Sequence, residues 1–120
     1  MYAYVTEDGV DLRDASEVWG RNVHDSVKFF QDRYGENDLS VITIGQAGEK
    51  LCRFANWMNE DDRASGRGGT GAVGGSKQLK AIVIKAEKAF PPTMDRDRWK
   101  EARRRALSTI MAEENITSPR

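Results

Sequence analysis

The chain is poor in two of the side chains that most often bind metals or act as nucleophiles: it has one cysteine and one histidine in 120 residues. The single cysteine, Cys52, excludes an intrachain disulfide and a cluster ligated by this chain's own thiolates. For the single histidine, His24, the sequence nominates no partner that would orient it as a general base. We therefore interpret His24 as a surface or capping residue and nominate no catalytic residue.

Long apolar runs and an excess of one charge are also absent. No apolar segment approaches the length needed to cross a bilayer, and the opening MYAYVTEDG lacks the basic and apolar regions of a signal peptide. The 19 basic residues balance the 19 acidic residues, which argues against a general nucleic-acid-binding protein that must neutralise many phosphates. We expect a cytoplasmic protein with neither a membrane nor a nucleic acid as partner.

Strand and helix signals alternate in the first half of the chain. An Asp-Gly turn pair separates the runs YAYVT and VDLRD, which predicts an N-terminal hairpin. An amphipathic helix is predicted between Asn22, its N-cap, and Gly35, its stop. The apolar residues at helical spacing in this segment are Val23, Val27, Phe30 and Tyr34.

Further strands are predicted in LSVITIG and, most strongly, in LKAIVIKA. LCRFANWM would be another strand and would place Cys52 as a buried thiol; the residues that would share one of its faces are Leu51, Arg53, Ala55 and Trp57. After two prolines, a final helix is predicted from Met94 to Glu113. Its buried stripe would be Trp99, Ala102, Ala106 and Ile110. The fold class is α+β: mixed strands with an N-terminal hairpin, one central amphipathic helix and a C-terminal helix.

A glycine-rich segment lies between the acidic run EDD and the strongest strand. RASGRGGTGAVGGSK, residues 63–77, holds six of the eleven glycines, and residues 63–80 contain four basic and no acidic side chains. Exposed backbone N–H groups together with Arg63, Arg67 and Lys77 would make an anion cradle. The alternative is a mobile glycine-rich linker without a ligand.

Two nucleotide-binding motifs fit this segment poorly. G-x-G-x-x-G occurs twice, but a Rossmann motif follows a strand directly and opens a crossover helix. Here the polar NEDDRASG comes first, and too few residues remain before Leu79 for a crossover of about ten residues. A P-loop needs Gly-Lys-Ser/Thr, whereas Gly75 is followed by Ser76 and then Lys77.

The segment RASGRGGTGAVGGSKQLKAIVI resembles the N-terminal domain of the tungsten-containing aldehyde:ferredoxin oxidoreductases. IGQAGEKLCRFANWMNEDDRASGRGG, which leads into it, and LRDASEVWG nearer the start continue the resemblance, which extends from Val10 to Lys85 in the family's order and spacing. Such a composite pattern is far more specific than a glycine motif alone.

The resemblance implies a role for the loop. In that family the N-terminal domain forms a base for a tungsten or molybdenum bis-pterin cofactor, and a glycine-rich loop lies against the pterin phosphates and a bridging magnesium ion. The arginines would reach the phosphates, and the Ala64 carbonyl would contact magnesium, while Lys77 would hold the loop. The cofactor-binding residues implied in this way are Arg63, Ala64, Gly66, Arg67, Gly68 and Gly69.

The sequence also departs from the family. The family's domain is larger, is apparently duplicated and carries a second cofactor-binding loop, and later domains supply the acid/base residues and the cysteines of a [4Fe–4S] cluster. None of these is found here, and Gly74 stands where members more often have methionine. We expect residues 1–90 to be a partial, pterin-facing domain and residues 91–120 to be a C-terminal helix and tail, together inactive alone.

Two functions remain open on this reasoning. In the first, the chain is a cofactor-facing fragment or subunit of an enzyme that oxidises aldehydes to carboxylic acids. Its partners are then the remaining domains or subunits and a ferredoxin-type electron carrier. Alternatively, it is a stand-alone binding or assembly module that keeps the loop without the chemistry.

Overall fold

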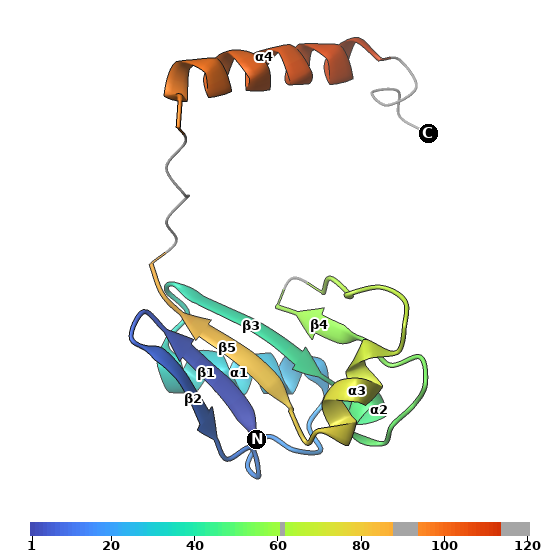
Figure 1. Ribbon diagram of the computed structural model, residues 1–120. Helices are drawn as coiled ribbons and strands as arrows, with labels where there is room; N and C mark the ends of the chain where they lie inside the picture. The colour runs from blue at the N-terminus through green and yellow to red at the C-terminus, as the bar shows by residue number, and fades with distance from the viewer. Residues whose placement is uncertain (61, 88–93, 114–120) are drawn as a thin grey trace. The chain divides into compact units, whose positions relative to one another are not determined.

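The computed structural model describes residues 1–60, 62–87 and 94–113, and its contacts divide the chain into two units, Met1–Lys88 and Ala89–Arg120. The described residues of the first unit form a five-stranded sheet with three helices, and those of the second unit form one helix (Figure 1). The predicted α+β class, with its N-terminal hairpin and C-terminal helix, is confirmed.

The sheet has the strand order β2-β1-β5-β3-β4. The strands are β1 (Tyr2–Thr6), β2 (Gly9–Arg13), β3 (Leu39–Ile44), β4 (Trp57–Asn59) and β5 (Ala81–Lys85). β1 and β5 pair in parallel, whereas the three other pairings are antiparallel. β5, the last strand along the chain, therefore lies between the first hairpin and β3.

The long helix of the first unit, α1 (Val23–Tyr34), follows the predicted signals. The Asn22 side chain caps it by accepting a hydrogen bond of 2.8 Å from the Asp25 amide. It ends at Gly35, whose φ of 78° is unfavourable for residues with a Cβ. Two shorter helices were not predicted: α2 (Gln46–Glu49) and α3 (Thr70–Ser76).

The core lies between α1 and one face of the sheet (Figure 1). Its buried residues are Tyr2, Ala15, Val18, Val27, Phe30, Leu39, Val41, Ala81 and Val83. Strand alternation directs Val10, Leu12 and Ile84 to the other face, where they are 63%, 67% and 41% exposed. The sheet is therefore covered by a helix on one side, and these apolar side chains remain accessible on the other.

The predicted strand over residues 51–58 is wrong, because the chain is extended only at β4. The Ala55 amide donates to the Cys52 carbonyl at 2.9 Å, and Leu51 has a φ of 59°, so this stretch turns. The apolar alternation there does not reflect a buried strand face. Cys52 is accordingly half-buried in a turn rather than buried in a strand.

The second unit contains α4 (Arg96–Ala112), close to the predicted bounds. Asp95 caps it by accepting hydrogen bonds from the amides of Asp97 and Arg98. The expectation that its apolar stripe is buried is wrong for the unit described by itself, since Trp99 is 50% exposed and Ile110 is 47% exposed. No other described helix or strand belongs to this unit, so the stripe has no element within it to pack against.

A cluster of tyrosines makes the stability of the first unit sensitive to alkaline pH. The hydroxyls of Tyr2 and Tyr34 lie 2.6 Å apart, and Arg13 donates to Tyr34 at 3.0 Å. Burial, and then the hydrogen bond with Tyr34, raises the pKa of Tyr2 from 10.0 to about 12. The stabilisation from protonated Tyr2 is therefore complete below pH 10, where the unfolded chain also keeps the proton. It is lost as the pH rises towards 12.

We expect the free energy of unfolding to fall between pH 10 and 12 more steeply in the wild-type chain than in Tyr2→Phe. Urea titrations followed by circular dichroism at pH 9 and pH 11.5 measure this difference. Tyr4→Phe is the control, because Tyr4 stacks on Tyr34 without a hydroxyl contact to it. Equal pH dependence of the wild type and Tyr2→Phe would contradict the assignment.

Candidate functional site

The glycine-rich segment divides into an exposed loop and a buried helix. Residues 63–68 are exposed and lead from β4 towards α3, which begins at Thr70. The loop starts beside β4: the Asn59 amide donates to the Arg63 carbonyl at 3.1 Å and the Ser65 amide donates to the Trp57 carbonyl at 2.9 Å. Its first residues are therefore held by the sheet.

The three glycines of α3 serve packing. A Cβ added at Gly75 would lie 2.0 Å from the Gly48 carbonyl oxygen, and one at Gly71 would lie 2.7 Å from the Asn56 oxygen. At Gly74 it would lie 2.5 Å from the Trp57 ring. α3 meets α2 and the 55–57 segment at backbone distance, so Gly71 and Gly75 exclude a side chain. A side chain at Gly74 would instead require the Trp57 ring to move.

The three glycines of the loop have a different requirement. Gly66, Gly68 and Gly69 all have positive φ, at 87°, 105° and 64°. A Cβ at Gly66 would meet no atom within 4 Å, so its backbone is open to solvent. Of the six glycines, the three in α3 therefore serve helix packing, and Gly66 and Gly68 shape an exposed turn where a ligand can approach the main chain. Gly69, at the end of the loop, is buried against the Arg53 backbone.

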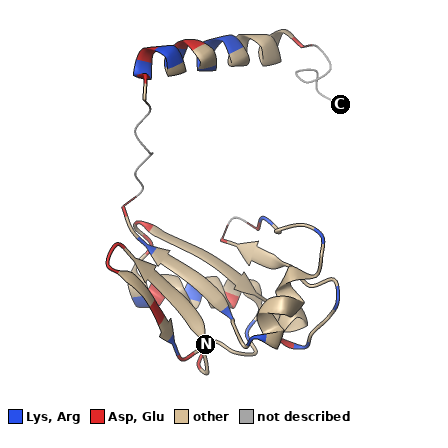
Figure 2. Cartoon of the chain, in the orientation of Figure 1, with Lys and Arg blue, Asp and Glu red and all other residues tan. Residues whose placement is uncertain are grey.

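The arginines around the loop have no acidic partner in the part of the chain that the structure describes. None of the ion pairs there involves Arg53, Arg63 or Arg67. Figure 2 shows basic segments on the loops beside β4 and α2. The hydrogen bonds among the described residues also leave the Ala64 carbonyl unused. As far as the described residues go, the loop thus offers guanidiniums without an ion-pair partner and a carbonyl oxygen without a hydrogen bond.

A cavity of about 360 Å³ lies beside the loop. It is lined by Arg53, Phe54, Asn56, Gly66, Arg67, Gly68 and Gly69. Four of the six predicted site residues therefore share one cavity, whereas Arg63 and Ala64 do not line it. Sequence reasoning gave Arg53, Phe54 and Asn56 no part in binding; their only signal was that they fall within the segment that resembles the family.

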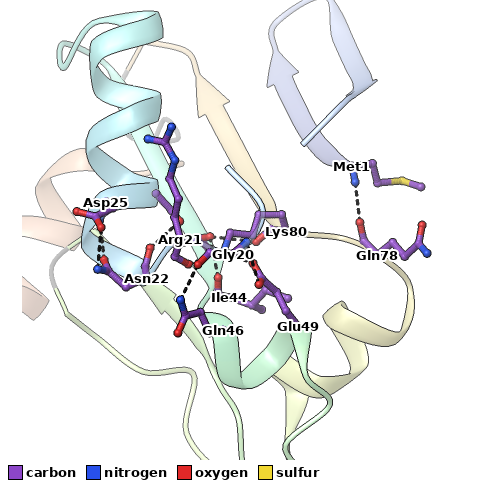
Figure 3. A network of polar contacts seen from close by, with 12 residues as sticks. Met1, Gly20, Arg21, Asn22, Asp25, Ile44, Gln46, Glu49, Gln78 and Lys80 are labelled. Carbon is purple, nitrogen blue, oxygen red and sulfur yellow. Dashed lines mark hydrogen bonds and ion pairs between the residues drawn. The ribbon is translucent and has the colours of Figure 1, made fainter. Parts of the chain in front are cut away.

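A buried ion pair joins Glu49 of α2 to Lys80, the residue before β5 (Figure 3). Lys80 Nζ lies 2.5 Å from Glu49 Oε1 and also donates to the Arg21 carbonyl at 2.9 Å. Glu49 accepts from the Gly20 amide at 3.0 Å, and the Lys80 and Glu49 side chains are 0% and 6% exposed. Burial lowers the pKa of Lys80, while Glu49 opposes that shift. The pair joins the start of β5, α2 and the loop before α1. Sequence reasoning gave neither residue this role.

Residues 1–60, 62–87 and 94–113 give little indication of a metal site or of a histidine general base. No group of three or more His, Cys, Asp or Glu side chains is placed there to hold a metal ion. His24 is exposed, 3.6 Å from Asp62, as predicted for a surface histidine. Glu60 accepts hydrogen bonds from Ser40 and the Val41 amide. Within the same residues, no helix has the length and apolarity to cross a membrane.

Comparisons with known proteins identify the family of this chain. Residues 1–86 match the family described as aldehyde ferredoxin oxidoreductase, N-terminal domain. The tungsten-containing aldehyde ferredoxin oxidoreductase of Pyrococcus horikoshii is 46% identical over 88 residues, which are 73% of this chain and 14% of that protein. The enzyme of the same name from Thermococcus kodakarensis is 45% identical over 91 residues, 76% of this chain and 15% of that protein.

Two further similarities extend beyond aldehyde oxidation. A Pyrococcus furiosus protein named aliphatic sulfonate oxidoreductase, WOR-like subunit, is 33% identical over 112 residues, covering 83% of this chain and 18% of that protein. The active site complex BamBC of benzoyl coenzyme A reductase, solved with 1,5-dienoyl-CoA, matches with a TM-score of 0.83 and 29% identity, over 95% of this chain and 17% of the matched chain. This chain spans less than a fifth of each of these relatives. The predicted resemblance is confirmed: the chain belongs to the family of the aldehyde ferredoxin oxidoreductase N-terminal domain.

Proposed function

We propose that the chain is the cofactor-facing part of a larger oxidoreductase with a tungsten or molybdenum bis-pterin, and that its loop of residues 63–69 binds the pterin phosphate. The observation that carries the proposal is an exposed turn, in a member of this family, whose Arg63 and Arg67 form no ion pair with another described residue. When bound, the cofactor would supply two-electron redox chemistry, by default the oxidation of an aldehyde to a carboxylic acid with a ferredoxin-type acceptor.

The part of this chain is to bind and orient. A guanidinium fork donates two parallel hydrogen bonds to phosphate oxygens, which suits Arg63 and Arg67. The positive φ of Gly66 and Gly68 leaves main-chain groups accessible beside them. The Ala64 carbonyl, free of other hydrogen bonds among the described residues, is our candidate ligand for a magnesium ion that bridges phosphates.

We assign the reaction of the substrate to other domains or subunits of the enzyme. The chain spans 14–18% of the related proteins, so the remaining domains or subunits would supply the acid/base residues and the thiolates of a [4Fe–4S] cluster. The relatives are named for different substrates: an aldehyde, an aliphatic sulfonate and benzoyl coenzyme A. This one domain is nevertheless similar in all of them. A domain shared across such different substrates is better suited to holding the cofactor than to selecting the substrate.

Replacement of both loop arginines is expected to reduce cofactor retention. The tagged chain and its Arg63→Ala/Arg67→Ala variant would be isolated from the native source with whatever they bind. Tungsten and molybdenum are measured by mass spectrometry and the pterin by fluorescence after oxidation. Charge-assisted hydrogen bonds contribute about 1.5–3 kcal/mol each, and about 1.4 kcal/mol is a factor of ten in affinity, so we expect cofactor retention to fall at least about tenfold.

The matched control is Arg33→Ala. Arg33 lies in α1, outside the loop, and the change removes its exposed ion pair with Glu17. It should retain the cofactor at the wild-type level. A wild-type chain recovered alone, with neither metal nor pterin, would overturn the proposal and favour the stand-alone module. Equal retention in the loop variant and the wild type would remove the loop from the site.

A further inference from the structure

The loop of residues 63–69 forms one wall of the cavity. We propose that Arg53 and Phe54 form a second wall, so that the cavity selects a phosphate-bearing planar heterocycle over a bare phosphate. Arg53 is inferred to be a further phosphate-binding residue, and Phe54 is inferred to provide the face on which the heterocycle stacks. The inference rests on the proposed function and adds residues and a specificity to it.

The two walls are held at a fixed spacing. The Gly71 amide donates to the Ala55 carbonyl at 2.9 Å, which ties the start of α3 to the segment that contains Arg53 and Phe54. At Gly69 the two backbones are so close that a Cβ would lie 2.1 Å from the Arg53 carbonyl oxygen. The end of the loop at Gly69 is therefore packed against the 53–56 segment, which fixes the spacing of the two segments at that point.

The chemistry of the second wall complements that of the loop. The Arg53 guanidinium forms no ion pair within the described residues and faces the same cavity as Arg67. Phe54 is 81% exposed, the highest value among the large hydrophobic side chains described in the first unit. Two cations with one accessible aromatic face fit a ligand that has both an anionic group and a flat ring.

The size of the cavity favours the same class of ligand. At about 360 Å³ it is within the usual range of small-molecule sites, and it is far larger than one phosphate group requires. Of the loop residues that line it, Arg67 alone carries a side chain, since Gly66, Gly68 and Gly69 present only backbone.

Two probes separate these contributions in the 120-residue chain. Inorganic pyrophosphate and 6-hydroxymethylpterin diphosphate would each be titrated by calorimetry. Stacking of a heterocycle on an aromatic side chain contributes about 1–3 kcal/mol, so we expect the wild type to bind the pterin diphosphate about tenfold more tightly. Phe54→Ala should abolish this preference while it leaves pyrophosphate binding intact. Arg53→Gln should weaken binding of both probes about tenfold.

Leu51→Ala is the control, since Leu51 is half exposed in the same segment but does not line the cavity. Circular dichroism verifies that all variants are folded. The inference is overturned if the wild type binds neither probe at millimolar concentration, if Phe54→Ala retains the preference for the pterin, or if Arg53→Gln binds both probes as the wild type does.

The metal content of the native complex distinguishes the two proposals. Suppose that the native complex contains a metal–pterin that is lost on Arg63→Ala/Arg67→Ala, and that the Arg53 and Phe54 variants bind the probes as the wild type does. This result would overturn the second wall and leave the proposed function standing. A chain that prefers the pterin diphosphate through Phe54, but is isolated from its source without metal, supports the second wall and overturns the oxidoreductase assignment.

Discussion

Lys80→Met is expected to destabilise the first unit by about 3–5 kcal/mol, because it leaves the buried Glu49 carboxylate without its cation. Both side chains are almost completely buried, and Lys80 Nζ also satisfies the Arg21 carbonyl. A domain of this size has a total stability of about 5–15 kcal/mol, so a loss of this magnitude removes a large part of it. The packing of α2, and with it the position of α3, depends on this pair.

Urea unfolding followed by circular dichroism measures the loss. Lys77→Met is the matched control, since Lys77 is exposed at the end of α3, and it should change the free energy of unfolding by about 0.5 kcal/mol or less. The double variant Lys80→Met/Glu49→Leu should recover part of the loss, because no uncompensated charge then remains buried. A Lys80→Met variant as stable as Lys77→Met would show that the pair does not support the fold.

Gly75→Ala is expected to be the most disruptive single methyl in the glycine segment, with a cost of about 3 kcal/mol or more. In a free helix the change would be favourable by about 1 kcal/mol, because alanine is the better helix former. Here the new Cβ would lie 2.0 Å from the Gly48 carbonyl oxygen and 3.3 Å from the Glu49 Cα, both backbone atoms that cannot rotate away. α2 and α3 must separate to admit it.

The neighbouring Ser76→Ala is a suitable comparison, since Ser76 is exposed in the same helix and bonds only the Val73 carbonyl. Thermal unfolding of the two variants should differ by more than ten degrees for this unit, given about 4–8 °C per kcal/mol in small domains. Nearly equal midpoints would mean that α2 and α3 are not packed at backbone contact in solution.

The elements that the sequence predicted well are those specified by local signals. α1 has an Asn22 cap, a glycine stop and apolar residues at helical spacing, and β5 is rich in isoleucine and valine. α2 and α3 had no such signals, because glycine is a poor helix former and three of the seven residues of α3 are glycine. These helices exist because Gly48 and Gly75 allow close packing, which is a tertiary effect.

The candidate site was predictable only in part for the same reason. The resemblance identified the loop residues, and four of them line one cavity. The wall formed by Arg53 and Phe54 arises from the hydrogen bond between the Gly71 amide and the Ala55 carbonyl, which joins segments that are distant in the sequence. A linear pattern does not contain that pairing, and the alternation around Arg53 taken alone predicts a strand that the fold does not form.

The strand order determines when this site can form during folding. β5 is the last strand of the first unit along the chain but lies inside the sheet, where it pairs Ala3 with Ile82 across almost the whole unit. Until it arrives, β1–β2 and β3–β4 are two separate pairs of strands, each too small to be stable in water. A nascent chain that ends before Ala81 therefore lacks the central strand of the sheet on which α1 packs. The sheet beside the loop is therefore complete only after β5, which follows the loop in the sequence, has been synthesised.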